Sequence, residues 1–250
     1  MSFQKTGFIH AVPWLMLATA MRIIYATSQG LVEHVTFTIA NLAILLAFLI
    51  VAHHLIVLTG GRTELGTLGF ARQIGIARPI VLRISLLLSG LAIAAVFFGA
   101  PGLAGQFLSV FDGIAFDQFS RVGALYSSVA AAAVLMMALA AESGRPATIA
   151  GALIELARRW KSMLPAIIAV TAFLVLLSSV QGDVRRVVQE LWETSWVPLA
   201  LRAYVYFAFI FSFATLRLCG SLAVLVLALR RSYRARAGAP VPPPPAIAGD

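Results

Sequence analysis

The sequence predicts an all-α, polytopic integral membrane protein with five or six transmembrane helices and short amphipathic connector helices at the membrane interface. Of the 250 residues, 60% are hydrophobic and 12% are charged, and the mean hydropathy is +0.93. A soluble domain is about 45–50% apolar and about 25% charged. In addition, the charged residues alternate with apolar runs long enough to cross a bilayer core of about 30 Å.

Five of these runs predict transmembrane helices within a membrane domain at 35–229. Pro79 and Pro165 stand where the second and fourth runs begin, the position in a helix at which a missing N–H matters least. The five runs are 35–58, 79–100, 122–141, 163–180 and 203–229.

The two ends of the chain differ from the membrane domain. In the N-terminal segment 1–34, residues 7–27 are apolar, but Pro13 and Arg22 leave them short for a span. Three readings remain open: a tilted sixth span, a helix lying on the membrane surface, or a cleaved signal peptide. The C-terminal segment 230–250 is basic and then proline-rich, which predicts a disordered cytoplasmic tail.

Two connectors have amphipathic helical patterns. In 183–196, apolar residues at helical spacing lie opposite a polar face that includes Arg185, Arg186 and Glu190. The second pattern covers 149–160 and ends at Trp160. Both patterns predict helices that lie flat at the interface.

The positive charges predict the orientation. With five spans, eleven Lys and Arg residues fall on one side of the membrane and five on the other, while Arg83, Arg202 and Arg217 lie within apolar runs. Cytoplasmic loops carry the excess of positive charge. We therefore expect a multi-pass protein of the bacterial inner (cytoplasmic) membrane whose C-terminus is cytoplasmic.

Catalytic motifs are absent, and no catalytic residue, cofactor or metal is predicted. The sequence has no HExxH or GxSxG motif, and Lys5 and Lys161 are its only lysines, which excludes a Walker lysine. Cys219 is the only cysteine, so the chain cannot build a cysteine metal site. Gly60-Gly61, Gly66 and Gly69 loosely resemble a phosphate loop, but no strand precedes them, and we interpret them as a flexible connector.

His53 and His54 are candidate proton-relay residues near one end of the first confident span. Adjacent helical side chains point about 100° apart, so the two cannot clamp one ion together. A bis-histidine haem would need a further histidine at similar depth, whereas His10 and His34 precede this span on the opposite side. The alternative is a polar cap at the interface.

Arg217 is the strongest candidate for an anion-binding or partner-binding residue. It lies deep in the last apolar run, where a charge costs at least about 2.5 kcal/mol. None of the predicted spans contains Asp or Glu, so its ligand could be a lipid headgroup, an anionic solute or another subunit's carboxylate. The alternative is an arginine that bonds to backbone carbonyls and to hydroxyls in its own run, such as Ser212, Thr215 and Ser221.

Two functional hypotheses follow. The first is an accessory or structural membrane subunit that contacts partner proteins or lipids, and the second is a small transporter or channel that uses Arg217 for an anionic or amphiphilic solute. A polar cavity near Arg217 favours the second, and a dry, alanine-packed centre favours the first. The expected partners are the lipid bilayer and, beyond it, other membrane subunits or anionic lipids. Nucleic acid is not expected, because the positive charges are not gathered into one patch.

Overall fold

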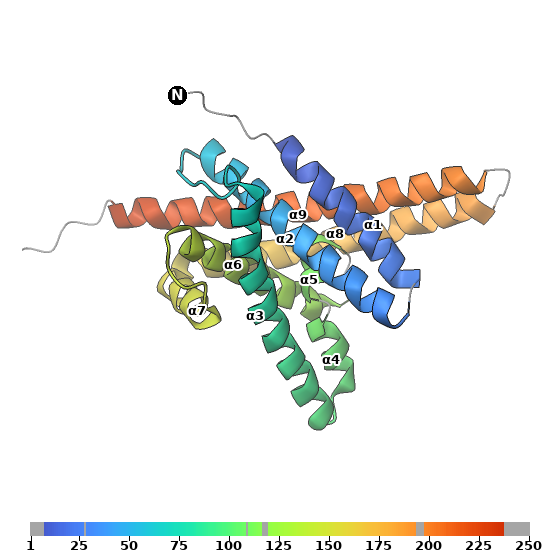
Figure 1. The fold of residues 1–250 in the computed structure, drawn as a ribbon, viewed down its shortest axis with the longest axis horizontal. Coiled ribbons are helices and arrows are strands. Elements are labelled where there is room, and N and C mark those ends of the chain that lie inside the picture. The colour runs from blue at the N-terminus through green and yellow to red at the C-terminus, as the bar shows by residue number, and fades with distance from the viewer. Residues whose placement is uncertain (1–7, 28, 109, 117–119, 194–197, 238–250) are drawn as a thin grey trace, which may run out of the picture.

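The prediction of an all-α polytopic membrane protein is confirmed. The computed structural model describes residues 8–27, 29–108, 110–116, 120–193 and 198–237, and all regular structure in these ranges is helical (Figure 1). Within these described ranges, six helices are long and apolar enough to span a membrane, and the first of them is the N-terminal segment whose role the sequence left open. The six segments are Phe8–Ala26, Leu31–Leu58, Phe70–Phe97, Arg121–Glu142, Trp160–Glu190 and Leu201–Arg234.

The elements follow one another with short connections. A 3-10 turn, Phe8–Ala11, leads into α1. The helices are α1 (Val12–Thr27), α2 (Leu31–Leu58), α3 (Phe70–Phe97), α4 (Pro101–Leu108), α5 (Val110–Ala115), α6 (Arg121–Glu142), α7 (Ile149–Arg158), α8 (Trp160–Glu193) and α9 (Leu199–Ala237).

Two helices form the centre of the molecule. Every residue from Ala43 to Ala52 in α2 is buried, and so is every residue from Ala131 to Ala138 in α6. A helix that is apolar on all sides is stable only when other helices surround it. In α6 the run of alanines and serines lets neighbouring helices approach closely, as is common in membrane interiors. The centre is therefore packed with small and aliphatic side chains.

The antiparallel pair α8 and α9 forms the long axis of the molecule (Figure 1). The two helices have 34 and 39 residues. At about 1.5 Å per residue they are about 50 and 58 Å long, so their ends extend beyond a bilayer core of about 30 Å. These projecting ends carry many of the charged residues.

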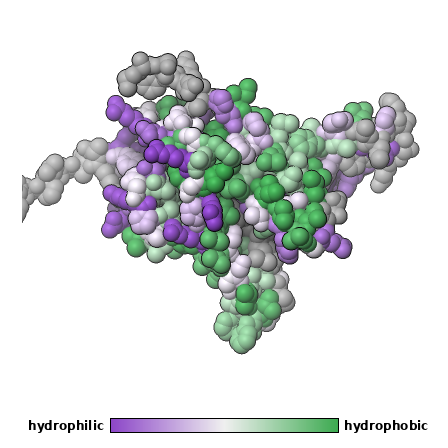
Figure 2. All heavy atoms as spheres, in the orientation of Figure 1, coloured by the Kyte–Doolittle hydropathy of each residue, from purple (hydrophilic) through white to green (hydrophobic). Residues whose placement is uncertain are grey.

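The third span has a different direction. α3 crosses the α8–α9 pair, and its C-terminal half extends with α4 away from the other helices (Figure 1). Its side chains Leu86, Ile93 and Phe97 are 64%, 71% and 87% exposed. Hydrophilic residues instead gather at the end of the molecule where α7 and the last turns of α9 lie (Figure 2). Apolar side chains on the exposed surface of α3 are expected where a helix faces lipid.

The helices extend further than the apolar runs. α3 and α8 begin before Pro79 and Pro165 and continue through them. α8 also continues without a break into 183–193, so the described part of the connector predicted at 183–196 is helical but is not a separate helix; residues 194–197 lie outside the described ranges. No proline interrupts the chain between 166 and 193, and the helix can therefore propagate.

The predicted disordered tail is also helical at its start. Residues 230–237 continue α9, which corrects the expectation for this part of the tail, while 238–250 lie outside the described residues. Arg, Ala and Leu are strong helix formers, and no glycine or proline occurs before Gly238 to end the helix. The basic residues at the end of α9 are thus held on one rigid element.

Candidate functional site

Arg217 is buried between α8 and α9. Its side chain is 1% exposed, and its Nη2 donates hydrogen bonds to Ser178 Oγ at 3.0 Å and to Gln181 Oε1 at 2.8 Å. Both acceptors belong to α8 and both are neutral. Hydroxyl groups on the helix of Arg217 itself were the alternative that the sequence suggested. The acceptors of these two bonds lie on the neighbouring helix instead. The arginine instead ties the two longest helices together near the middle of the pair.

A cavity of about 430 Å³ lies beside this pair, between α1, α5, α8 and α9. Its wall has an apolar part, formed mainly by aromatic and aliphatic side chains, and a polar part rich in nitrogen donors. The apolar residues are Ile23, Ala26, Ala115, Phe116, Val188, Phe209, Ile210, Phe213 and Ala214, and the polar residues are Arg22, Gln181, Arg185, Gln189 and Tyr206.

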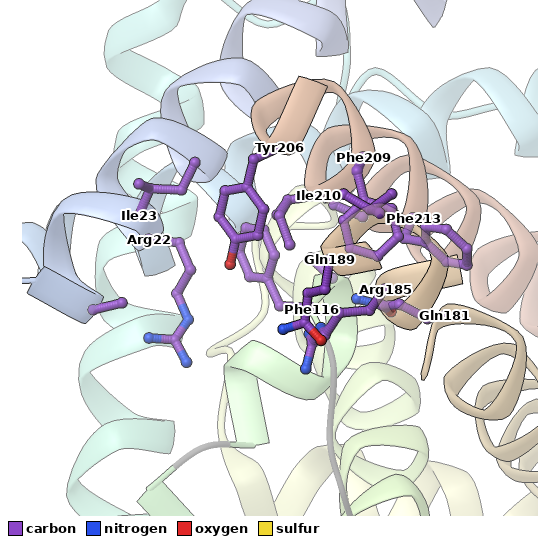
Figure 3. A pocket seen from close by; sticks show the side chains of 14 residues that line it. Arg22, Ile23, Phe116, Gln181, Arg185, Gln189, Tyr206, Phe209, Ile210 and Phe213 are labelled. Atoms are coloured by element: carbon purple, nitrogen blue, oxygen red, sulfur yellow. The ribbon is translucent and has the colours of Figure 1, made fainter. Parts of the chain in front are cut away.

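Two arginines reach the cavity from different helices. Arg22 comes from the last turns of α1, while Arg185 comes from α8 beside Gln189, and Tyr206 of α9 points its hydroxyl into the space between them (Figure 3). The Arg22 guanidinium also lies 4.6 Å from the centre of the Tyr25 ring, a cation–π contact that orients it. Among the described residues that line the cavity, the charged side chains are the two arginines.

The neighbour of Arg185 has a different role. Arg186 does not line the cavity and forms an exposed ion pair with Asp183 at 3.5 Å. Such surface pairs contribute at most about 1 kcal/mol. Arg185 and Arg186 therefore differ in surroundings although they are adjacent in sequence.

Gln181 connects the cavity to Arg217. It lines the cavity wall and at the same time accepts the hydrogen bond from Arg217. Ala214, one turn before Arg217 on α9, also lines the wall. From Tyr206 to Ala214 the cavity extends about 12 Å along α9, at about 1.5 Å per residue. Arg217 thus lies outside the cavity wall but contacts Gln181, one of the residues that form it.

The other sequence candidates lie elsewhere. His53 is buried, its ring packs against the backbone of Gly66, and its Nδ1 has no hydrogen-bond partner among the described residues. Neither His53 nor His54 lines the cavity. In the part of the chain that the structure describes, no group of three His, Cys, Asp or Glu residues could hold a metal ion.

Sequence reasoning missed most of the residues of this cavity. It treated Arg22 as a residue that shortens the first apolar run and Arg185 as part of a polar helix face, and it counted both as charges that set the orientation. The available signal was Gln181, a polar residue directly after the fourth apolar run. Its contact with Arg217 and its place in the cavity wall depend on the alignment of α8 and α9. No family model, no curated protein and no solved structure matches the chain.

Proposed function

We propose that this integral membrane protein binds an amphiphilic anion, a molecule with a carboxylate or phosphate head and an apolar tail, in the cavity between α1, α5, α8 and α9. The single observation that carries the proposal is a cavity whose wall combines two arginines and a tyrosine hydroxyl with a layer of aromatic side chains. The arginines and Tyr206 would hold the head, because charge-assisted hydrogen bonds to a guanidinium are the strongest in proteins. The Phe and Ile side chains would cover the tail.

In this proposal Arg217 is a positioning residue. Its bonds to Ser178 and Gln181 fix the spacing of α8 and α9 and hold the Gln181 side chain in the cavity wall. The arginine does not line the cavity, so a direct contact with the ligand is not part of the proposal. This modifies the sequence hypothesis, which placed the anion on Arg217 itself.

We also propose that the cavity opens toward the non-cytoplasmic side of a bacterial inner membrane. With six spans, Lys5 joins the basic side, which then carries twelve Lys and Arg residues against four on the side of Arg22 and Arg185. By the positive-inside rule the side with twelve is cytoplasmic, and both termini lie there.

Reporter fusions test this orientation. A fluorescent or phosphatase reporter fused after Arg62, Arg145 or Arg236 should give the cytoplasmic signal, and one fused after Glu190 should give the periplasmic signal. Each site is at or near the end of a span, so the preceding helices remain intact. A periplasmic signal after Arg145 would reverse the proposed orientation.

Binding of decanoate tests the function. In nanodiscs of zwitterionic lipid, the full-length protein should bind radiolabelled decanoate, and decanol, which lacks the charge, should not compete at the same concentration. Arg185→Gln and Arg22→Gln should each weaken decanoate binding by about tenfold, the loss expected for one charge-assisted hydrogen bond of about 1.5 kcal/mol. Scintillation proximity measures both constants.

Arg186→Gln is the matched control. It removes the same charge one residue away, at an exposed site outside the cavity, and should leave decanoate binding unchanged. Equal losses in Arg185→Gln and Arg186→Gln would mean that only the overall charge attracts the anion, and the cavity proposal would be wrong.

An accessory subunit is the second candidate function, and the arm formed by α3 and α4 favours it. The arm presents Leu86, Ile93 and Phe97 away from the rest of the chain, where a neighbouring membrane helix could pack. Absence of decanoate binding in the unaltered protein would leave this candidate as the function that the fold supports.

A further inference from the structure

A second cavity lies at the opposite, basic end of the molecule. It has a volume of about 410 Å³ and is formed by the ends of α2, α6 and α9 and by the connection that follows α2. Three arginines line it: Arg62 from the connection, and Arg230 and Arg234 one turn apart on α9. The apolar part of its wall includes Ile56, Leu139, Val226 and Leu229.

The end of α2 is shaped so that Arg62 reaches this cavity. α2 ends at Leu58, and the N–H groups of Gly60 and Gly61 bond to the carbonyls of Val57 and Ile56 at 2.9 and 2.8 Å. Gly60 has φ +83°, a conformation that is strained for other residues. A Cβ atom at Gly60 would also lie 3.9 Å from Nη2 of Arg230. The turn therefore brings the connection directly against the end of α9.

The three guanidinium groups have no acidic partner in the part of the chain that the structure describes. Glu142, at the end of α6, does not line the cavity. Its carboxylate accepts hydrogen bonds from the Thr63 hydroxyl at 2.9 and 2.8 Å and from the N–H of Glu64. Three positive charges around one cavity repel each other, and an anion between them removes this repulsion.

Tyr233 holds the end of α9 in place. Its ring lines the cavity, and the guanidinium of Arg159 lies 4.2 Å from the ring centre. Arg159 is itself buried and bonded to Glu155 of α7 at 2.5 Å. The cation–π contact thus links the α7–α8 corner to the α9 turn that carries Arg230 and Arg234.

The depth of this cavity matches the headgroup region of a bilayer. From Tyr206, at the first cavity, to Arg230 the helix α9 rises by about 36 Å, at about 1.5 Å per residue. The hydrocarbon core is about 30 Å thick. Cavities at the two ends of α9 therefore lie near opposite membrane surfaces, and this one lies on the side that carries the excess of positive charge.

We propose that Arg62, Arg230 and Arg234 form a phosphate-binding site at the basic membrane surface. Arginine is suited to phosphate because its planar guanidinium can donate two parallel hydrogen bonds. Basic cavities between transmembrane helices at this depth are typical binding sites of phosphate headgroups of anionic lipids. The same chemistry would accept free phosphate, and the two sources are separated by experiment.

The test uses the full-length protein purified in mild detergent. After incubation with equal amounts of phosphatidylglycerol and phosphatidylcholine, native mass spectrometry should detect retained phosphatidylglycerol. Arg230→Gln and Arg234→Gln should each reduce its retention by about tenfold, as expected for loss of one charge-assisted hydrogen bond. Arg231→Gln is the matched control, because Arg231 is exposed on the same turn of α9 and does not line the cavity. Arg230→Lys should retain part of the binding.

A second arm uses inorganic phosphate alone and measures the melting temperature of the protein. Preferential retention of phosphatidylglycerol that depends on Arg230 assigns the site to a lipid headgroup. Stabilisation by phosphate that depends on Arg230, without lipid preference, assigns it to free phosphate. Equal effects of Arg231→Gln and Arg230→Gln, or binding of neither probe, would overturn the proposal. Melting temperatures of all variants without ligand show that the variants are folded.

Discussion

Gln181→Leu is expected to destabilise the helical bundle by about 1.5–3 kcal/mol, because it removes the neutral acceptor of a charge-assisted hydrogen bond from a buried arginine. Arg217 is 1% exposed, and Gln181 accepts its 2.8 Å hydrogen bond. Arg217→Leu should cost much less. It leaves Gln181 without this donor, at about 1–3 kcal/mol, but also removes a charge that costs at least about 2.5 kcal/mol at this depth. Unfolding titrations in mixed micelles measure both.

The double variant distinguishes this explanation from simple loss of packing. If Gln181 serves Arg217, then Gln181→Leu should have little further effect once Arg217 is leucine, and the two changes should be strongly non-additive. Gln189→Leu is the control, since Gln189 lies on the same helix about 12 Å further along and lines the same cavity. A cost for Gln181→Leu that is no greater than that of Arg217→Leu would contradict the proposed role.

Gly220→Val is expected to destabilise the α8–α9 pair by about 1–3 kcal/mol, the usual cost of overpacking. A Cβ atom at Gly220 would lie 2.5 and 2.6 Å from Cζ and Cε1 of the Phe173 ring, far inside van der Waals contact. The ring of Phe173 therefore has to move, and with it the contact surface of the two longest helices. Thermal unfolding followed by circular dichroism should show the loss.

A second substitution and a control identify the cause. Phe173→Ala should recover part of the stability of Gly220→Val, because it removes the ring that the new side chain meets. Gly90→Val places the same side chain on a transmembrane helix where a Cβ atom would have nothing within 4 Å, and should be close to neutral. Equal losses at Gly90 and Gly220 would mean that helix propensity, rather than the Phe173 contact, decides.

The sequence predicted the fold class and the transmembrane helices because both depend on local properties. A run such as 35–58 is apolar along its whole length and is long enough to cross the bilayer, whatever its neighbours are. The helix boundaries were less predictable. Hydropathy reports where polar residues begin, whereas a helix ends where its hydrogen bonding ends, and for this reason α8 continues past Val180 to Glu193.

The candidate site was predictable only in part. The depth of Arg217 follows from its position in an apolar run, and its cost in lipid marks it as unusual. Its partners Ser178 and Gln181 lie 39 and 36 residues away, and their identity depends on how α8 is rotated and shifted against α9. The spacing of apolar residues in a single sequence does not determine how α8 is rotated and shifted against α9.

By itself, then, the sequence determined that the chain is helical, that it spans a membrane, and that one arginine lies deep within it. These properties follow from the free energy of placing each segment in lipid, which is nearly a sum over its own residues. Only the tertiary structure decided that Arg22 and Arg185 share a cavity and that Arg62 joins Arg230 and Arg234 at the other end. Both groupings bring together residues from different helices, and packing between helices depends on shapes that are not local in the sequence.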